Sequence, residues 1–199
     1  MSSAPASYLT PEQYLEQERK ARFKSEYYRG ETFAMAGASY RHSVILNNLA
    51  ITLGPLLRPS NCRVHTSDLR SRISPTGLYT YPDLMVICGN PAFADDQRDT
   101  VLNPVVIMEI LSDSIKDYDR GQKFQHYRAL DSVADYLTIS QTEVRVEHYA
   151  RQSAGRWLLS EFDRIESEVT LTSVNIPLSL SEVYFQIEFP EVPEPESLS

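Results

Sequence analysis

Hydrophobic positions in the first third of the chain recur at helical spacing. After Ser39, apolar side chains fall every three or four residues and form one stripe together with His42: Ile45, Leu46, Leu49, Leu53, Leu56 and Leu57. This spacing predicts a helix that Gly54-Pro55 kinks or ends, because proline lacks the amide hydrogen that a helix interior needs. A shorter helix is predicted from Pro11 to about Lys20, with Thr10 and Gln13 forming a capping box.

Short apolar runs separated by turn residues predict the strands. Residues 25–35 carry aromatic side chains on both sides of Arg29-Gly30, a pattern typical of a β-hairpin. Further runs predict one bent strand or two short ones over 62–66 and 69–73, and strands over 83–88 and 104–111. The polar segment 89–103 is expected to be an exposed loop. A helix is predicted over 118–130, followed by strands at 134–139, 144–149 and 157–159.

The order of these elements indicates the fold class. Across residues 40–140 it reads helix, three strands, helix, strand, which predicts an α+β fold with a central mixed sheet and a helix on each side. The strands after residue 140 add an antiparallel extension. We expect one domain over residues 1–188. Residues 189–199 contain three prolines and three glutamates and are expected to form a disordered tail.

Composition and charge narrow the function classes. The net charge of −8 argues against a broad basic surface that holds nucleic acid by charge alone. Cys62 and Cys88 are far apart and neither belongs to a Cys-x-x-Cys pair, so both a zinc site and a disulfide scaffold are disfavoured, and a reduced cytoplasmic setting is expected. No apolar run approaches the roughly 20 residues that span a bilayer, so no membrane association is expected.

Two carboxylates at the ends of apolar runs are the first candidates for chemistry. Asp83 follows Tyr81-Pro82 at the start of one predicted strand, and Glu109 interrupts the apolar face of another strand that it shares with Ile107 and Leu111. An unpaired buried carboxylate is costly, and a cation is one of the few adequate partners. With the backbone carbonyl of Ile110 as a third oxygen ligand, this pair predicts a site for magnesium or manganese.

Lys123 supplies a cation for the same site. On the predicted helix 118–130, Phe124, Tyr127 and Leu130 serve as packing positions, which leaves Lys123 to reach past the strand ends. A metal-bound water and a nearby ammonium are suited to hydrolysing a phosphodiester bond. The alternatives are a turn acid at Asp83, an arginine partner for Glu109 and a solvated helix lysine at Lys123.

The same segments resemble a known family. Tyr81-Pro82-Asp83, the strand ending Glu109-Ile110-Leu111-Ser112, the segment 118–124 and Val146-Glu147-His148-Tyr149 are similar to the Uma family of restriction-endonuclease-like proteins over about residues 10–188. That family belongs to the PD-(D/E)xK nuclease superfamily. The resemblance implies a restriction-endonuclease-like core of the order αβββαβ.

The resemblance also implies site residues. The superfamily pairs an acid after proline with a Glu-x-Lys, whereas here Leu111 stands two positions after Glu109. Lys123 matches a position to which superfamily members can move the lysine. Glu31, His42 and Asp68 match further polar positions of the family and are carried over as supporting groups.

Two functional hypotheses follow. The first is a magnesium-dependent nuclease in which Asp83 and Glu109 bind the metal and Lys123 orients the water, with DNA as the expected substrate. The second is a catalytically silent nuclease fold that binds nucleic acid or a protein. A homodimer is expected, because the tyrosine-rich hairpin and the strands near 144–160 offer surfaces for a two-fold contact.

Overall fold

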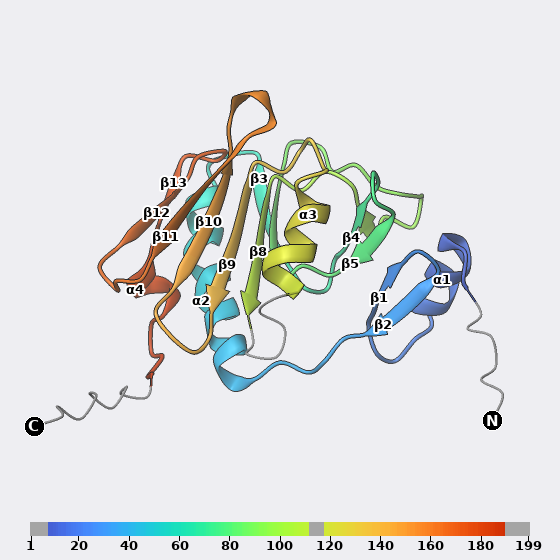
Figure 1. Cartoon of the computed structure of the whole chain (residues 1–199), viewed down its shortest axis with the longest axis horizontal. Coiled ribbons are helices and arrows are strands. Elements are labelled where there is room, and N and C mark those ends of the chain that lie inside the picture. The colour runs from blue at the N-terminus through green and yellow to red at the C-terminus, as the bar shows by residue number, and fades with distance from the viewer. Residues whose placement is uncertain (1–7, 112–117, 190–199) are drawn as a thin grey trace, which may run out of the picture.

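A six-stranded mixed sheet forms the centre of the computed structural model, which describes residues 8–111 and 118–189. Its order is β11-β10-β9-β8-β6-β3 (Figure 1). Strands β8 and β9 are parallel, and the other neighbours are antiparallel. The bounds are β3 Cys62–Thr66, β6 Leu84–Cys88, β8 Val106–Leu111, β9 Asp135–Ser140, β10 Val146–Arg151 and β11 Trp157–Phe162. The predicted mixed sheet with an antiparallel extension is therefore confirmed.

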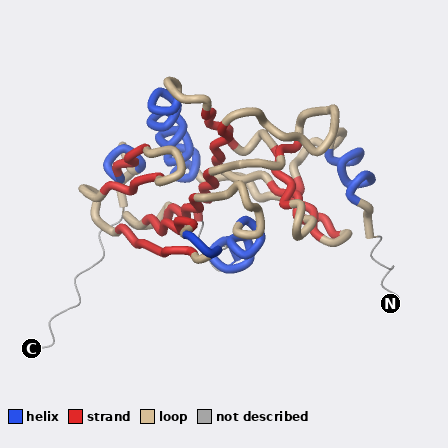
Figure 2. The backbone as a smooth tube through the Cα atoms, turned by 90° about the horizontal axis from the view of Figure 1, so that it is seen from above, coloured by secondary structure: helices blue, strands red, loops and turns tan. Residues whose placement is uncertain are grey.

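Helices cover the two faces of this sheet. Figure 2 shows the long helix α2 (Tyr40–Leu57) on one side and the helical segment η1–α3 on the other. Along β8, Met108 and Ile110 pack in the core that includes Leu49 of α2, while Ile107 packs with Tyr127 of α3. This alternation is what the sequence predicted for residues 104–111, and it places Glu109 on the α3 face.

The helices differ in detail from their prediction. Ser39 caps α2 through its side chain, and the helix continues through Pro55 to Leu57 instead of ending at Gly54-Pro55. Proline is tolerated there because only one hydrogen bond near the end of the helix is lost. The predicted helix 118–130 is divided into a π-helical turn, η1 (Tyr118–Lys123), and a short α3 (Phe124–Tyr127).

A second sheet contains the strands of the N-terminal part of the chain. Its order is β2-β1-β5-β4-β7, with β1 Ser25–Tyr28, β2 Glu31–Ala34, β4 Arg70–Ile73, β5 Leu78–Thr80 and β7 Thr100–Val101. Helix α1 (Pro11–Glu18) has the predicted capping box and packs Tyr14 against Tyr27 and Tyr79. The hairpin is confirmed, whereas β3 and β4 belong to different sheets and β5 was not predicted.

The C-terminal elements cover the α2 side of the core. The hairpin of β12 (Glu168–Leu171) and β13 (Ile176–Ser179) and the helix α4 (Leu180–Val183) bury their apolar residues in the core that contains α2. The expected tail lies outside the described residues from 190 onward. None of the helices in the described part of the chain has the length and apolar content needed to cross a membrane.

The cysteine prediction was wrong. Cys62 of β3 lies directly opposite Cys88 of β6, and the two form a disulfide. They are 26 residues apart in sequence, and only the pairing register of the two strands brings them together. The expected reduced cytoplasmic setting therefore loses the support that it took from free cysteines.

Candidate active site

Asp83 joins three elements at one end of the six-stranded sheet. One of its carboxylate oxygens, Oδ2, accepts a hydrogen bond of 2.7 Å from the backbone N–H of Ile110, near the end of β8. The other, Oδ1, lies 3.1 Å from Nε2 of His42 at the start of α2. His42 Nδ1 is buried and finds no hydrogen-bond partner in the described part of the chain. Asp83 is thus part of a tertiary network and not an isolated turn acid.

Glu109 lies on the buried face of β8 next to α3. Its side chain is only 3% exposed. Its Oε1 accepts a hydrogen bond of 2.6 Å from the Tyr127 hydroxyl and lies 3.4 Å from Nζ of Lys123. Burial and the negative charge of Glu109 raise the pKa of Tyr127 well above its usual value. The hydroxyl therefore stays protonated and donates a hydrogen bond to Glu109. The cation observed beside Glu109 is a lysine, where the alternative expected an arginine.

Lys123 occupies the position that its helix predicted. It ends η1, while Tyr127 and Leu130 are buried in the core on that face of the sheet and Phe124 packs against it. Its Nζ lies 3.3 Å from Oε1 of Glu26 and 3.4 Å from Oε1 of Glu109, and the residue is 7% exposed. The alternative of a solvated helix lysine is therefore wrong.

Glu26 was missed as a site residue. It lies on β1, is 8% exposed, and accepts a hydrogen bond of 2.6 Å from Thr80 of β5 in addition to its contact with Lys123. The sequence shows that Glu26 shares a strand face with Tyr28, but only the structure shows that this face meets the second half of the chain, where the Tyr28 ring contacts His126. An acid on a face that packs against the second half of the chain is a candidate for a buried ion pair.

Two predicted supporting residues lie away from these contacts. Glu31 is exposed on the outer strand β2, opposite Tyr28. Asp68 lies in the turn after β3, where a core strand was expected, with its side chain 90% exposed and paired with Lys24 at 2.6 Å. The turn directs the carboxylate of Asp68 toward Lys24 and not toward the candidate site.

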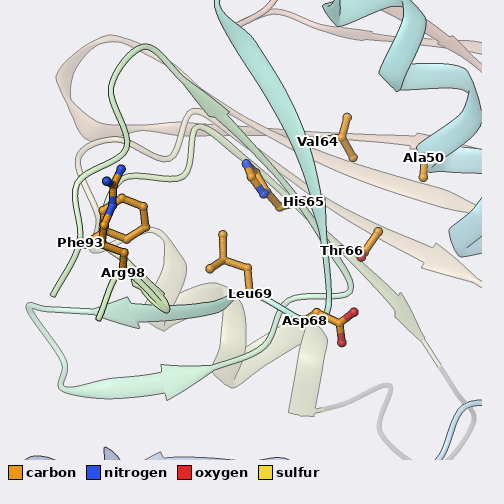
Figure 3. A pocket seen from close by; sticks show the side chains of 8 residues that line it. All are labelled: Ala50, Val64, His65, Thr66, Asp68, Leu69, Phe93 and Arg98. Atoms are coloured by element: carbon orange, nitrogen blue, oxygen red, sulfur yellow. The ribbon is translucent and has the colours of Figure 1, made fainter. Parts of the chain in front are cut away.

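Asp68 instead borders a groove along the free edge of β3. Figure 3 shows its lining, to which β3 contributes Val64, His65 and Thr66 and the later loop contributes Phe93 and Arg98. Burial lowers the pKa of His65, so its ring is neutral at pH 7. Thr66 pairs with Leu84, the residue after Asp83, so the groove begins beside the same end of the sheet.

A polar row continues from Glu109 across the sheet. Glu109 pairs with Thr138 of β9, which pairs with Glu147 of β10, and the Thr138 hydroxyl donates a hydrogen bond of 3.2 Å to Glu147. Both side chains are buried. In the segment Val146-Glu147-His148-Tyr149, Glu147 and Tyr149 therefore lie on the α3 face, and the Tyr149 hydroxyl donates a hydrogen bond of 3.3 Å to Glu147.

The donor set is compatible with a hard divalent cation. The carboxylates of Asp83 and Glu109 offer oxygen ligands, and each carboxylate oxygen can accept more than one interaction. Within residues 8–111 and 118–189, no group of three or more His, Cys, Asp or Glu side chains could hold a metal ion. Magnesium is often held by one or two carboxylates and several waters, so the two carboxylates fit it. The structure shows Asp83 at the Ile110 N–H, and a role for the Ile110 carbonyl stays a prediction.

Similar proteins point to one family. A family model described as "Putative restriction endonuclease", Uma2, matches residues 11–181. Two proteins of Synechocystis sp. are similar along nearly their whole length. "Uncharacterized protein sll1609" is 36% identical and covers 88% of this chain and 99% of its own length. "Uncharacterized protein slr1290" is 35% identical and covers 94% and 97%.

A solved structure supports the fold. A crystal structure from Anabaena variabilis, described as "a putative nuclease belonging to DUF820", has a TM-score of 0.70 and 19% sequence identity. The match covers 88% of this chain and 97% of that one. At this identity the likeness concerns the fold, which is restriction-endonuclease-like. The family match over residues 11–181, together with the two relatives, shows that the chain belongs to the Uma2 family of nuclease-like proteins.

Proposed function

We propose that this protein is a magnesium- or manganese-dependent nuclease that hydrolyses phosphodiester bonds in nucleic acid, with DNA as the expected substrate. The observation that carries the proposal is a series of contacts that runs from Asp83 through β8 to Lys123. Asp83 binds the amide of the residue that follows Glu109, and Glu109 contacts Lys123 at 3.4 Å. This is the grouping that the family resemblance implies for phosphodiester hydrolysis.

Asp83 and Glu109 would hold the metal, with the Ile110 carbonyl as a third oxygen. A bound divalent ion lowers the pKa of a water molecule and polarises the phosphate. Each carboxylate is fixed in place by a neighbour, since His42 and the Ile110 N–H hold Asp83 and the Tyr127 hydroxyl holds Glu109. A ligand that is already oriented loses less freedom when the cation binds.

Lys123 acts as the positively charged group next to the reacting phosphate. Its ammonium orients the attacking water and stabilises the negative charge that develops on the phosphate oxygens. Glu26 and Glu109 hold this ammonium from two sides, at 3.3 and 3.4 Å. We assign Glu26 as a positioning residue, because it acts through Lys123.

The partner of the site is a polyanion, although the chain carries a net charge of −8. Binding must therefore rely on local cations, chiefly the metal ion and Lys123, and not on a general attraction between opposite charges. We propose in addition that the protein acts as a homodimer, as nucleases that cut duplexes commonly do.

A second candidate is a catalytically silent member that binds nucleic acid or a protein partner. The observation that favours it is Leu111, which stands where the superfamily motif has lysine and is buried in β8. In that case the contacts between Lys123 and its two carboxylates are structural ion pairs.

Calorimetry with magnesium or manganese separates the two candidates. We expect the wild-type chain to bind a divalent ion and to cleave DNA. Asp83→Ala and Glu109→Ala should lose both properties, while the exposed control Glu166→Ala should keep both. Ion binding without cleavage of DNA or RNA would support the silent candidate. Absence of binding at millimolar concentrations of either ion would overturn the proposed mechanism.

A further inference from the structure

Strand β11 is an open edge of the central sheet. In the described part of the chain it pairs with β10 alone and has no neighbour on its other side. We propose that β11 is the contact surface of the homodimer: the β11 strands of two copies pair antiparallel across a two-fold axis at Leu159. This inference rests on the proposed homodimer and is independent of the nuclease chemistry.

The hydrogen-bond pattern shows which backbone groups of β11 face outward. The Gln152 N–H donates to the Arg156 carbonyl at 2.8 Å, so even-numbered residues of β10 point toward β11. The Arg151 N–H donates to Ala134 on the opposite side, also at 2.8 Å, which gives the same result. In an antiparallel ladder the groups alternate, so the N–H and C=O of residues 157, 159 and 161 face away from β10.

One register uses all of these outward groups. Centring the two-fold axis on Leu159 places Leu159 opposite its own copy, and Trp157 opposite Glu161 of the other chain. All six outward groups of each strand then find partners, whereas a shift of the axis by one residue leaves part of them unpaired. A self-complementary strand edge is what an isologous interface requires.

The side chains on β11 fit contact with a second copy. Leu158 is 55% exposed and Leu159 is 46% exposed, on opposite faces of the strand. In the proposed register Leu159 meets Leu159 of the second copy, and Leu158 lies opposite its Ser160. Two neighbouring exposed leucines on an unpaired strand edge favour pairing of that edge with another strand.

The charged residues at the ends of β11 permit the same register, because no like charges meet directly across the axis. Arg156 comes opposite Phe162 of the second copy, and Glu161 comes opposite its Trp157. Like charges directly opposite each other would destabilise a strand pair. Glu161 is also held at 2.6 Å by Arg145 of its own chain.

The other sheet edge, β3, is less suited to this pairing. Its outward-facing residues are Cys62, Val64 and Thr66, because the Gly89 N–H donates to the Asn61 carbonyl. The Cys62 N–H already donates to Ser60 Oγ, and the Thr66 carbonyl accepts from the Leu69 N–H. Only Val64 keeps both outward groups without such a partner among the described residues, so β11 is the edge that can extend the sheet.

Sedimentation equilibrium of the full chain tests this proposal. We expect a wild-type dimer and at least a hundredfold weaker association for Leu159→Lys, which places two ammonium groups on the axis. The control Ile51→Lys changes a residue of α2 that is 70% exposed and should stay dimeric. A monomeric wild type would overturn both the homodimer and its interface. A Leu159→Lys dimer of wild-type affinity would overturn the interface alone.

Cross-linking keeps the test valid if the lysine variant does not fold. Leu159→Cys places one thiol on the axis, and mild oxidation should join the two copies covalently. Leu56→Cys, at a leucine of equal 46% exposure on α2, should stay uncoupled. Equal cross-linking of the two variants would contradict the proposed register. None of these results depends on whether the protein cleaves nucleic acid.

Discussion

The ammonium nitrogen of Lys123 lies 3.4 Å from Oε1 of Glu109, although the two residues belong to different secondary-structure elements. Glu109 is on the central strand β8, and Lys123 ends the π-helical turn before α3. This contact connects the strand that carries the candidate metal ligand to the helix that carries the candidate catalytic cation. It also makes the fold sensitive to changes at either residue.

Replacing Lys123 by methionine should reduce both stability and cleavage. Removal of the ammonium takes this cation away from the buried carboxylates of Glu26 and Glu109. Breaking a buried pair in this way costs about 3–5 kcal/mol, and loss of one charge-stabilising group lowers turnover by about 10²–10³-fold. Denaturant unfolding and single-turnover cleavage measure the two effects.

Lys20→Met is the matched control for that change. Lys20 forms a surface pair with Glu16 and is 73% exposed, so the loss should stay below about 1 kcal/mol and cleavage should not change. Equal behaviour of the two lysine variants would contradict a special place for Lys123.

Tyr127→Phe should lower stability and slow cleavage while leaving the fold intact. The substitution removes the hydroxyl that donates to Glu109 at 2.6 Å inside the core. A buried acceptor that loses its donor costs about 1–3 kcal/mol. Tyr27→Phe removes a comparable hydrogen bond of 2.8 Å to the Leu9 carbonyl and should lower stability alone. Cleavage rates that fall equally in both variants would argue against a positioning role for Tyr127.

Stability should fall between about pH 4 and pH 2 because of Asp99. Hydrogen bonds from Arg19 lower the pKa of Asp99 from 3.8 to about 2, with a further contribution from Arg70. A carboxyl whose folded pKa is depressed stabilises the fold above its unfolded pKa, and this stability is lost as the pH falls through the folded value. The melting temperature of Asp99→Asn should therefore change less over this window than that of the wild type.

Asp96→Asn is the control for Asp99. Asp96 is an exposed acid of the same loop, and its replacement should leave the pH dependence of the melting temperature as it is in the wild type. An unchanged pH profile in Asp99→Asn would show that its pairing with Arg19 contributes nothing to stability.

Reduction of the Cys62–Cys88 disulfide should destabilise the protein without affecting the site. Closing a loop of 26 residues stabilises a fold by about 3 kcal/mol through the unfolded chain. Cys88 ends β6, whereas Asp83 precedes its start, so the site geometry should survive reduction. Unfolding in the presence and absence of dithiothreitol measures the difference, and Cys62→Ser should show none.

Local patterns were enough to predict much of the fold. The stripe after Ser39 predicted α2, the Arg29-Gly30 turn predicted the first hairpin, and the alternation in 104–111 placed Glu109 on the face opposite Ile110. These features depend on residues that are close together in the sequence, so the sequence pattern alone is enough to predict them. The helix spacing around Lys123 likewise indicated which side chains pack and which one reaches Glu109.

The misses share another physical cause. The disulfide depends on the register between β3 and β6, and the contact of Glu26 with Lys123 depends on how one sheet lies against another element. Neither relation leaves a periodic signal in the sequence. Asp68 was misplaced for the same reason. The strand that follows it, β4, joins a different sheet from β3, so Asp68 lies in the turn between the two strands and not in a core strand.

The two carboxylates around Lys123 come from different halves of the architecture, Glu109 from the six-stranded sheet and Glu26 from the N-terminal hairpin. A molecule in which the hairpin is detached can keep its main sheet and still lack one of the two anchors of the ammonium group. On the proposed function, catalytic competence therefore requires that the hairpin has docked. A copy whose hairpin has not docked would not cleave the nucleic acid around it.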